Sequence, residues 1–181
     1  MKVKGPVSAT TRAYLDGMRD KLAEGLDLVR GGEGNRMKMV LGNLFDLGGT
    51  PISWGLTEEE KSNVRAHVME WNDRVAAVAA ARNIPVLDWW GWWEDAVNAG
   101  VNLCGIGIDP HAKSPRDDSD LTILTSLTHD GVHPTPAGAA LMANRFLQAI
   151  KTHYGEDVEL LTDQEIVALA GLAPAVTTSS D

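Results

Sequence analysis

Cysteine and positive charge are both scarce in this 181-residue chain, and each scarcity excludes a class of function. The single cysteine, Cys104, excludes an internal disulfide and a zinc site built from cysteines alone, although it leaves the cellular compartment open. Lysine and arginine together number 16 against 25 aspartates and glutamates, so the formal net charge is -9. A surface of that sign repels phosphate backbones, and we therefore expect no nucleic-acid partner.

Long apolar runs are also missing. No stretch approaches the roughly 18 to 20 apolar residues that a membrane-spanning helix needs, and the lysines near Met1 are not followed by the apolar core of a signal peptide. We therefore expect neither a membrane span nor a signal peptide in the chain as it stands. With 44% hydrophobic and 23% charged residues, the composition is typical of one soluble globular domain.

The first half of the chain alternates between helix and strand patterns. Residues 10–30 carry apolar side chains at three- and four-residue steps, which predicts a helix. Residues 37–44 form a short apolar run, typical of a buried strand in a parallel sheet. A capping box at 57–60 opens a second helix that ends near Asn83, and residues 84–89 read as a second strand. This order predicts an α/β domain.

The second half is less regular. Residues 91–128 support only a short helix at 92–98 and a solvated polar loop. Thr135 followed by Pro136 is an N-cap and first-turn pair that predicts a helix toward Tyr154. Another capping box at 162–165 predicts a short helix to Leu172, followed by a frayed tail. Only two strands are convincing, although an α/β sheet usually has about five, so we expect part of the sheet to be missing.

The segment 129–138, HDGVHPTPAG, has the clearest chemical signature. Asp130 and His133 lie three residues apart on a loop that a capped helix fixes at its far end. A carboxylate so placed can hold imidazole Nδ1 while Nε2 points into a cleft, which is how a base and its orienting acid act in ester hydrolysis. The alternative is a simple Asp-Gly turn before a capped helix, with His133 on the surface.

This segment resembles the block D-G-x-H-P-[TN]-x-x-G that precedes the last helix of the SGNH (GDSL-type) hydrolases. A second segment, VLGNLFDLGGTP at 40–51, is similar to the loop that follows the fourth strand of that family. The resemblance covers roughly residues 7 to 153 in colinear order. It implies a flavodoxin-like three-layer sandwich with a parallel sheet, and an activity among esterases, lipases, acyl-thioesterases and carbohydrate deacetylases. In that reading Asp130 and His133 match the acid and base of a Ser-His-Asp triad.

Three blocks of the family are absent from the sequence. The resemblance implies a serine in Gly-Asp-Ser-Leu and oxyanion donors from a glycine and from the asparagine of Gly-x-Asn-Asp, and the sequence has none of these three. We therefore expect residues 1–155 to be the C-terminal part of such a domain, with an incomplete sandwich, and residues 156–181 to form a short helix and tail. The expected function is an ester hydrolase by resemblance, with the nucleophile missing and activity only if another segment completes the site.

Other interpretations stay open beside this one. The chain is alternatively a non-catalytic remnant or interaction module that associates with itself or with an N-terminal complementing segment. A metal-dependent hydrolase built on His129, Asp130 and His133 with His111 and Asp109 is a weaker alternative, and we expect no metal and no other cofactor. The ligand expected for a completed site is a small ester.

Two further residues and one aromatic cluster are candidates for the cleft. Asn43 and Asp46 follow a strand, where open α/β sheets place their ligands, so they are candidate substrate contacts; a role in structuring the loop is equally favoured. For the tryptophan cluster at 89–93 the favoured interpretation is a place in the hydrophobic core, and the alternative is the lining of an acyl or sugar pocket.

Overall fold

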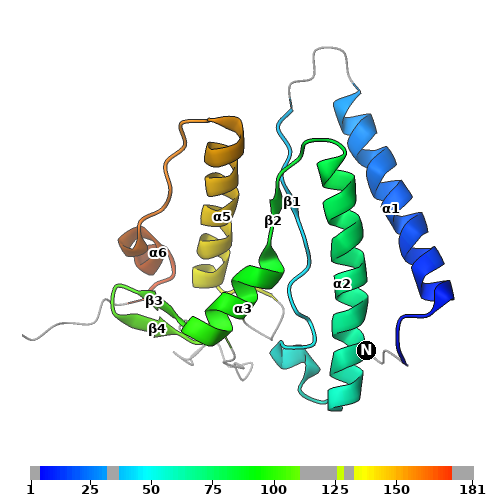
Figure 1. Ribbon diagram of the computed structural model, residues 1–181. Coiled ribbons are helices and arrows are strands. Elements are labelled where there is room, and N and C mark those ends of the chain that lie inside the picture. Colours follow the sequence, from blue (N-terminus) through cyan, green and yellow to red (C-terminus); the bar gives the residue numbers. More distant parts are fainter. Residues whose placement is uncertain (1–4, 32–36, 111–125, 129–132, 173–181) are drawn as a thin grey trace, which may run out of the picture.

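The computed structural model describes residues 5–31, 37–110, 126–128 and 133–172 (Figure 1). Two strands lie at the centre, β1 (Leu41–Gly42) and β2 (Val86–Leu87). They pair in parallel, Leu41 with Val86 and Gly42 with Leu87. Helices α1 (Ala9–Arg30) and α2 (Glu58–Ala80) lie on one side of the pair and α5 (Pro136–Tyr154) on the other. The described part is thus a partial α/β sandwich with a parallel sheet, as the sequence predicts.

Both expected strands are present, but each is shorter than expected. The runs 37–44 and 84–89 contribute only two ladder residues each. The second run is cut short because Asp88 accepts a hydrogen bond from the Gly91 N–H at 3.0 Å and so caps a helix. That helix, α3 (Trp89–Ala99), begins three residues before the expected start at residue 92. Trp89 is therefore helical, and the strand assignment for it was wrong.

Helix α1 begins one residue before the expected residue 10, and α2 begins within the predicted capping box. Ser8 accepts from the Thr11 N–H, and Thr57 with Glu60 forms a reciprocal capping box. Ion pairs then join the two helices, including Arg74 to Asp16 at 2.9 Å. A side-chain hydrogen bond from Arg74, together with one from Arg12, holds the pKa of Glu70 below its usual value. Ion pairs between the charged faces of α1 and α2 thus fix the position of one helix along the other.

The apolar faces of α1 and α2 cover one side of the sheet. Leu26 of α1 packs with Val78 and Ala79 of α2 and with Ile84 before β2. Partly buried Leu41 and Val86 of the two strands pack against this cluster. On the other side, the Trp89 and Phe146 rings meet edge to face at 5.5 Å between centroids, which joins the sheet end to α5.

A hairpin in the region 91–128 was not expected. Strands β3 (Val101–Leu103) and β4 (Ile106–Ile108) pair antiparallel and form a sheet of their own. Cys104 and Gly105 at its tip both have positive φ, 52° and 84°, as a tight two-residue hairpin turn requires. The hairpin therefore adds strands to the chain without extending the β1–β2 sheet.

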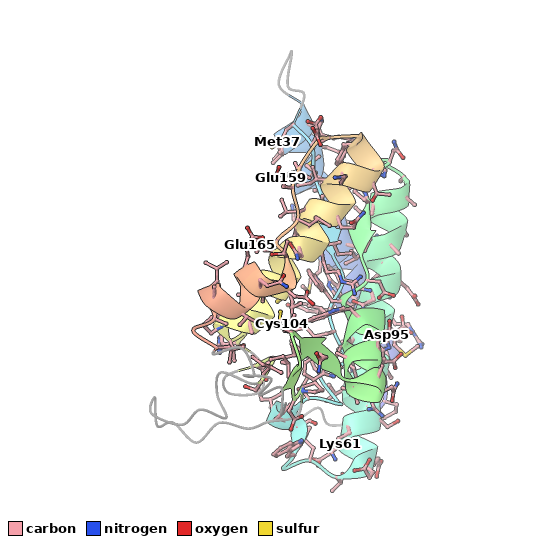
Figure 2. All side chains as sticks on the ribbon, turned by 90° about the vertical axis from the view of Figure 1, so that its left-hand side faces the viewer. Met37, Lys61, Asp95, Cys104, Glu159 and Glu165 are labelled. Atoms are coloured by element: carbon pink, nitrogen blue, oxygen red, sulfur yellow. The ribbon has the colours of Figure 1, made fainter. Side chains whose placement is uncertain are left out.

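The last two helices complete the larger core. Helix α5 begins at Pro136 with Thr135 as N-cap, as predicted, and α6 (Asp163–Leu169) has the expected capping box but ends three residues before Leu172. Figure 2 views these helices from the side, with Glu165 and Cys104 labelled. Buried residues from α3, the hairpin, α5 and α6 meet there, among them Trp93, Leu103, Ala137 and Ile166.

Among the described residues, no helix combines the length and the apolar character needed to cross a bilayer.

Candidate active site

Two short backbone pairings anchor the segment that carries the predicted acid and base. Thr128 bridges to Pro134 in antiparallel fashion, and the Thr135 N–H donates to the Leu127 carbonyl at 3.1 Å. His133 lies just inside these anchors with an exposed side chain. Asp130 and His129 lie outside the described residues, so the predicted hydrogen bond between Asp130 and His133 Nδ1 stays a prediction.

Thr135 has a second role besides capping α5. Its buried hydroxyl donates to the Ser126 carbonyl at 2.6 Å, and its Oγ1 accepts from the Gly138 N–H at 3.0 Å. One side chain thereby fixes the start of α5 to the strand-like segment 126–128. His133, the predicted base, lies two residues before this contact.

Gly138 explains why the motif ends in glycine. A Cβ at this position would fall far inside contact distance of the Leu127 carbonyl oxygen, a backbone atom that cannot swing away. The first turn of α5 can approach segment 126–128 only because residue 138 has no side chain. The close approach also brings Thr135 within reach of Ser126.

Asn43 joins the ends of the two parallel strands. Its Oδ1 accepts from the Trp89 N–H at 2.6 Å and from the Trp90 N–H at 3.2 Å, while its Nδ2 donates to Asp88 Oδ1 at 2.8 Å. The amide therefore satisfies free N–H groups at the start of α3. These bonds favour the loop-structuring role over a direct substrate contact for Asn43.

Asp46 is buried, with 4% of its surface exposed. Its Oδ2 accepts from Arg65 Nε at 2.8 Å, and its Oδ1 has no hydrogen-bond partner among the described residues. Gly49 lies so close that a Cβ there would meet Asp46 Oδ2 at 2.5 Å. The glycines of this loop therefore make room for the Asp46 carboxylate, which ties the loop to α2 through Arg65.

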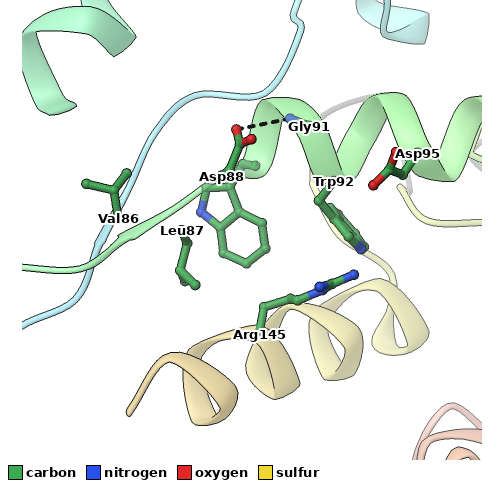
Figure 3. A pocket seen from close by; sticks show the side chains of 8 residues that line it. Val86, Leu87, Asp88, Gly91, Trp92, Asp95 and Arg145 are labelled. Carbon is green, nitrogen blue, oxygen red and sulfur yellow. Dashed lines mark hydrogen bonds between the residues drawn. The ribbon is translucent and has the colours of Figure 1, made fainter. Parts of the chain in front are cut away.

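Two cavities adjoin the strand ends. The first, about 270 Å³, lies beside β2 between α3 and α5 and is polar. Figure 3 shows Arg145 reaching from α5 toward Trp92, with Asp95 nearby. Sequence reasoning did not single out Arg145 or Asp95, because each is an ordinary charged position on an amphipathic helix.

The second cavity, about 50 Å³, is apolar and lies under the anchors of the His133 loop. Its walls come from three parts of the chain: Phe45 after β1, tryptophans of α3, and Thr128 with Pro134. Trp89 and Trp93 are buried at 7% and 3% exposure, so the cluster serves both as core and as cavity wall. Its lining is Phe45, Trp89, Trp92, Trp93, Leu127, Thr128, Pro134, Gly138 and Met142.

A metal centre gains no support from the part of the chain that the structure describes. No group of three histidine, cysteine, aspartate or glutamate side chains there is placed to hold an ion. His111 and His129, named in the metal hypothesis, lie outside that part. His67 Nδ1 lies 2.6 Å from the Asn63 carbonyl, and His153 Nε2 lies 3.3 Å from the Asn83 carbonyl, which fits the structural roles expected for both.

A family model described as GDSL-like Lipase/Acylhydrolase matches residues 7–146. No curated protein and no solved structure matches the chain.

Proposed function

Since the chain belongs to the family of GDSL-like lipases and acylhydrolases, we propose that it supplies the base half of an ester-hydrolysing site, with His133 as base and Asp130 as its orienting acid. The proposal follows the resemblance of segment 129–138 to the family's last block. In it, the serine and the oxyanion donors come from residues other than these 181.

The chemistry assigned to this half-site is proton transfer. His133 Nε2 takes the proton of a serine hydroxyl while that oxygen bonds to the ester carbonyl carbon. The resulting imidazolium, stabilised by Asp130 at Nδ1, returns the proton to the alcohol oxygen as the ester C–O bond breaks. Water then attacks the acyl-serine with the same histidine as base, which releases the acid and restores the serine.

One observation carries the proposal. The 50 Å³ cavity is lined both by residues that follow the parallel strands, Phe45 and Trp89, and by residues that flank the His133 segment, Thr128 and Pro134. Open α/β sheets bind ligands outside the carboxyl ends of their strands. The predicted base therefore stands beside the position where such a fold binds its substrate.

The described serines support an external nucleophile. The Ser53 hydroxyl donates to the Gly48 carbonyl at 2.7 Å, and the Ser126 hydroxyl donates to the Thr128 carbonyl at 2.8 Å; both are buried. Ser8 caps α1. The fourth described serine, Ser62, lies inside α2, so none of the four lies at a strand-to-helix elbow.

Among the described residues only β2 pairs with β1, and the other, open edge of β1 is where a complementing segment would pair. The Leu41 and Asn43 N–H groups donate toward β2, so the alternation of a strand points the Gly42 N–H to the other edge. Gly42 is exposed although it lies in the sheet. We propose a parallel strand as the partner of this edge, because parallel sheets bury their strands on both sides.

Hydrolysis of p-nitrophenyl acetate tests the function. We expect the chain alone to show no turnover above its His133→Ala variant, since a lone imidazole lacks a nucleophile and oxyanion donors. We expect turnover when the residues encoded upstream of Met1 are expressed in frame with it and supply a Gly-Asp-Ser segment. Turnover by the chain alone that a serine substitution abolishes would contradict the proposal.

Self-association is the second candidate property, favoured by the open edge of β1 and the apolar side chains near it. Met37 is 55% and Leu44 is 40% exposed. We expect light scattering at micromolar concentration to show dimers or larger species of the chain alone. Val40→Lys should shift them toward monomer, because a lysine at a strand edge opposes pairing, whereas Met69→Lys on α2 should not. A monomeric, cooperatively unfolding wild-type chain would contradict this expectation.

A further inference from the structure

The small cavity under the His133 segment has the features of an acyl-binding site. Its walls are aromatic and aliphatic on nearly all sides, and edge-to-face contact between Trp89 and Trp92, at 5.7 Å between ring centroids, fixes one wall. Resting on the proposed function, we infer that this cavity binds the acyl group of the ester and admits only short acyl groups, from acetyl to butyryl.

A single hydroxyl in the lining points to a ligand with a polar atom. Thr128 is 5% exposed, and its buried Oγ1 has no hydrogen-bond partner among the described residues. The neighbouring buried hydroxyls differ, since Ser126 and Thr135 each donate to a carbonyl. An unpaired buried hydroxyl destabilises a fold. Thr128 can donate to the carbonyl oxygen of an acyl group, which gives this hydroxyl a partner.

The size of the cavity sets the acyl length. Each water-sized group needs about 10–15 Å³ of such a cavity. The available 50 Å³ therefore holds about three to five groups. An acetyl group has about three heavy atoms and a butyryl group about five, whereas an octanoyl group has about nine, roughly twice what the space holds. Met142 of α5 is the flexible wall residue whose length closes the cavity on the helix side.

The position of the cavity relates it to the predicted base. Pro134 lines the cavity and directly follows His133, and Thr128 lies on the opposite anchor of the same segment. An acyl group bound here has its carbonyl end next to the segment that carries His133. The larger, polar cavity beside Arg145 and Asp95 shares Trp89 and Trp92 with this lining, and we assign it to the alcohol side of the ester or to solvent.

Binding can be measured on the chain without any turnover. Indole N–H resonances of the tryptophans report on the cavity through Trp89, Trp92 and Trp93, and Trp54 and Trp71 lie outside its lining as internal references. Methyl acetate and methyl butyrate should shift the cavity signals at millimolar concentration and leave the reference signals in place. Methyl octanoate should not shift them in the wild type.

Three variants separate size from polarity. Met142→Ala should admit methyl octanoate. Thr128→Val should weaken methyl acetate binding by about five- to tenfold, since it deletes only the hydroxyl, and Thr128→Ser should restore it. Equal shifts with all three esters in the wild type, or unchanged binding in Thr128→Val, would overturn the inference. Ester binding without hydrolysis by the extended chain would instead contradict the proposed function and leave the cavity assignment standing.

Discussion

Gly138→Ala is expected to lower the free energy of unfolding by about 2–3 kcal/mol, the size of an overpacked core position. The added methyl meets the Leu127 carbonyl oxygen, so α5 must move away from segment 126–128. The Thr135 hydroxyl then loses its acceptor, Ser126, and the two anchors of the His133 segment separate. Chemical denaturation followed by far-UV circular dichroism measures the loss.

Gly17→Ala is the matched control. Gly17 lies inside α1, and a Cβ there meets nothing within 4 Å. The same substitution should raise stability by about 0.5–1 kcal/mol, because alanine loses less conformational freedom than glycine in a helix. If both substitutions changed the free energy of unfolding equally, close packing would not be the reason that residue 138 is a glycine.

His133→Ala is expected to lower kcat by about 10⁴- to 10⁶-fold in the extended chain that carries the serine and oxyanion segments, since triad members act as a unit. Asp130→Asn should lower kcat by about 10⁴-fold, because an amide holds the wrong imidazole tautomer. KM should change little in both variants, as neither side chain is assigned to ground-state binding. Initial rates with p-nitrophenyl acetate give both constants.

His153→Ala provides the control for the histidine substitution. His153 lies near the C-terminal end of α5, whereas the His133 segment precedes its N-terminal end at Pro136. The His153 ring lies edge to face on Tyr154. Its removal should leave kcat and KM within about twofold, in line with the small effect of most surface substitutions. A fall in kcat that is equal for His133→Ala and His153→Ala would point to a general loss of folding.

Local signals predicted the helices of this chain well. Thr57 with Glu60, Thr135 with Pro136, and Thr162 with Glu165 each mark a helix start that the structure has within one residue. These signals work because a cap satisfies backbone N–H groups within the same few residues. Nothing distant is needed, so sequence alone suffices.

Strand ends were harder, because they depend on side chains remote in sequence. Trp89 has the apolar pattern of a strand residue, yet Asp88 and the Asn43 amide, about 45 residues away, turn it into a helix. The β3–β4 hairpin was missed for a different reason. Cys104 adopts a left-handed backbone conformation at the tip of the hairpin, yet cysteine is not a residue type that predicts a turn.

The candidate site divides in the same way. The motif located His133 and the cap at Thr135, whereas the cavity wall combines Phe45, Trp92 and Met142 from three separate segments. Their convergence follows from tertiary packing, which no local pattern encodes. Thr128 carried no sequence signal at all, since the lack of a hydrogen-bond partner for its hydroxyl among the described residues is visible only in the folded structure.

Asn72 of α2 sets a limit on how far a neighbouring strand can extend along β1. Its amide accepts from the Leu44 N–H and donates to the Leu44 carbonyl, both at 2.8 Å, so it copies the two bonds that a peptide group would make. A strand that adds to β1 finds Leu44 already occupied and must stop pairing at Gly42. Asn72 thus sets the length of edge that β1 offers to a partner, and its replacement by a side chain without an amide would leave the Leu44 peptide groups available for pairing.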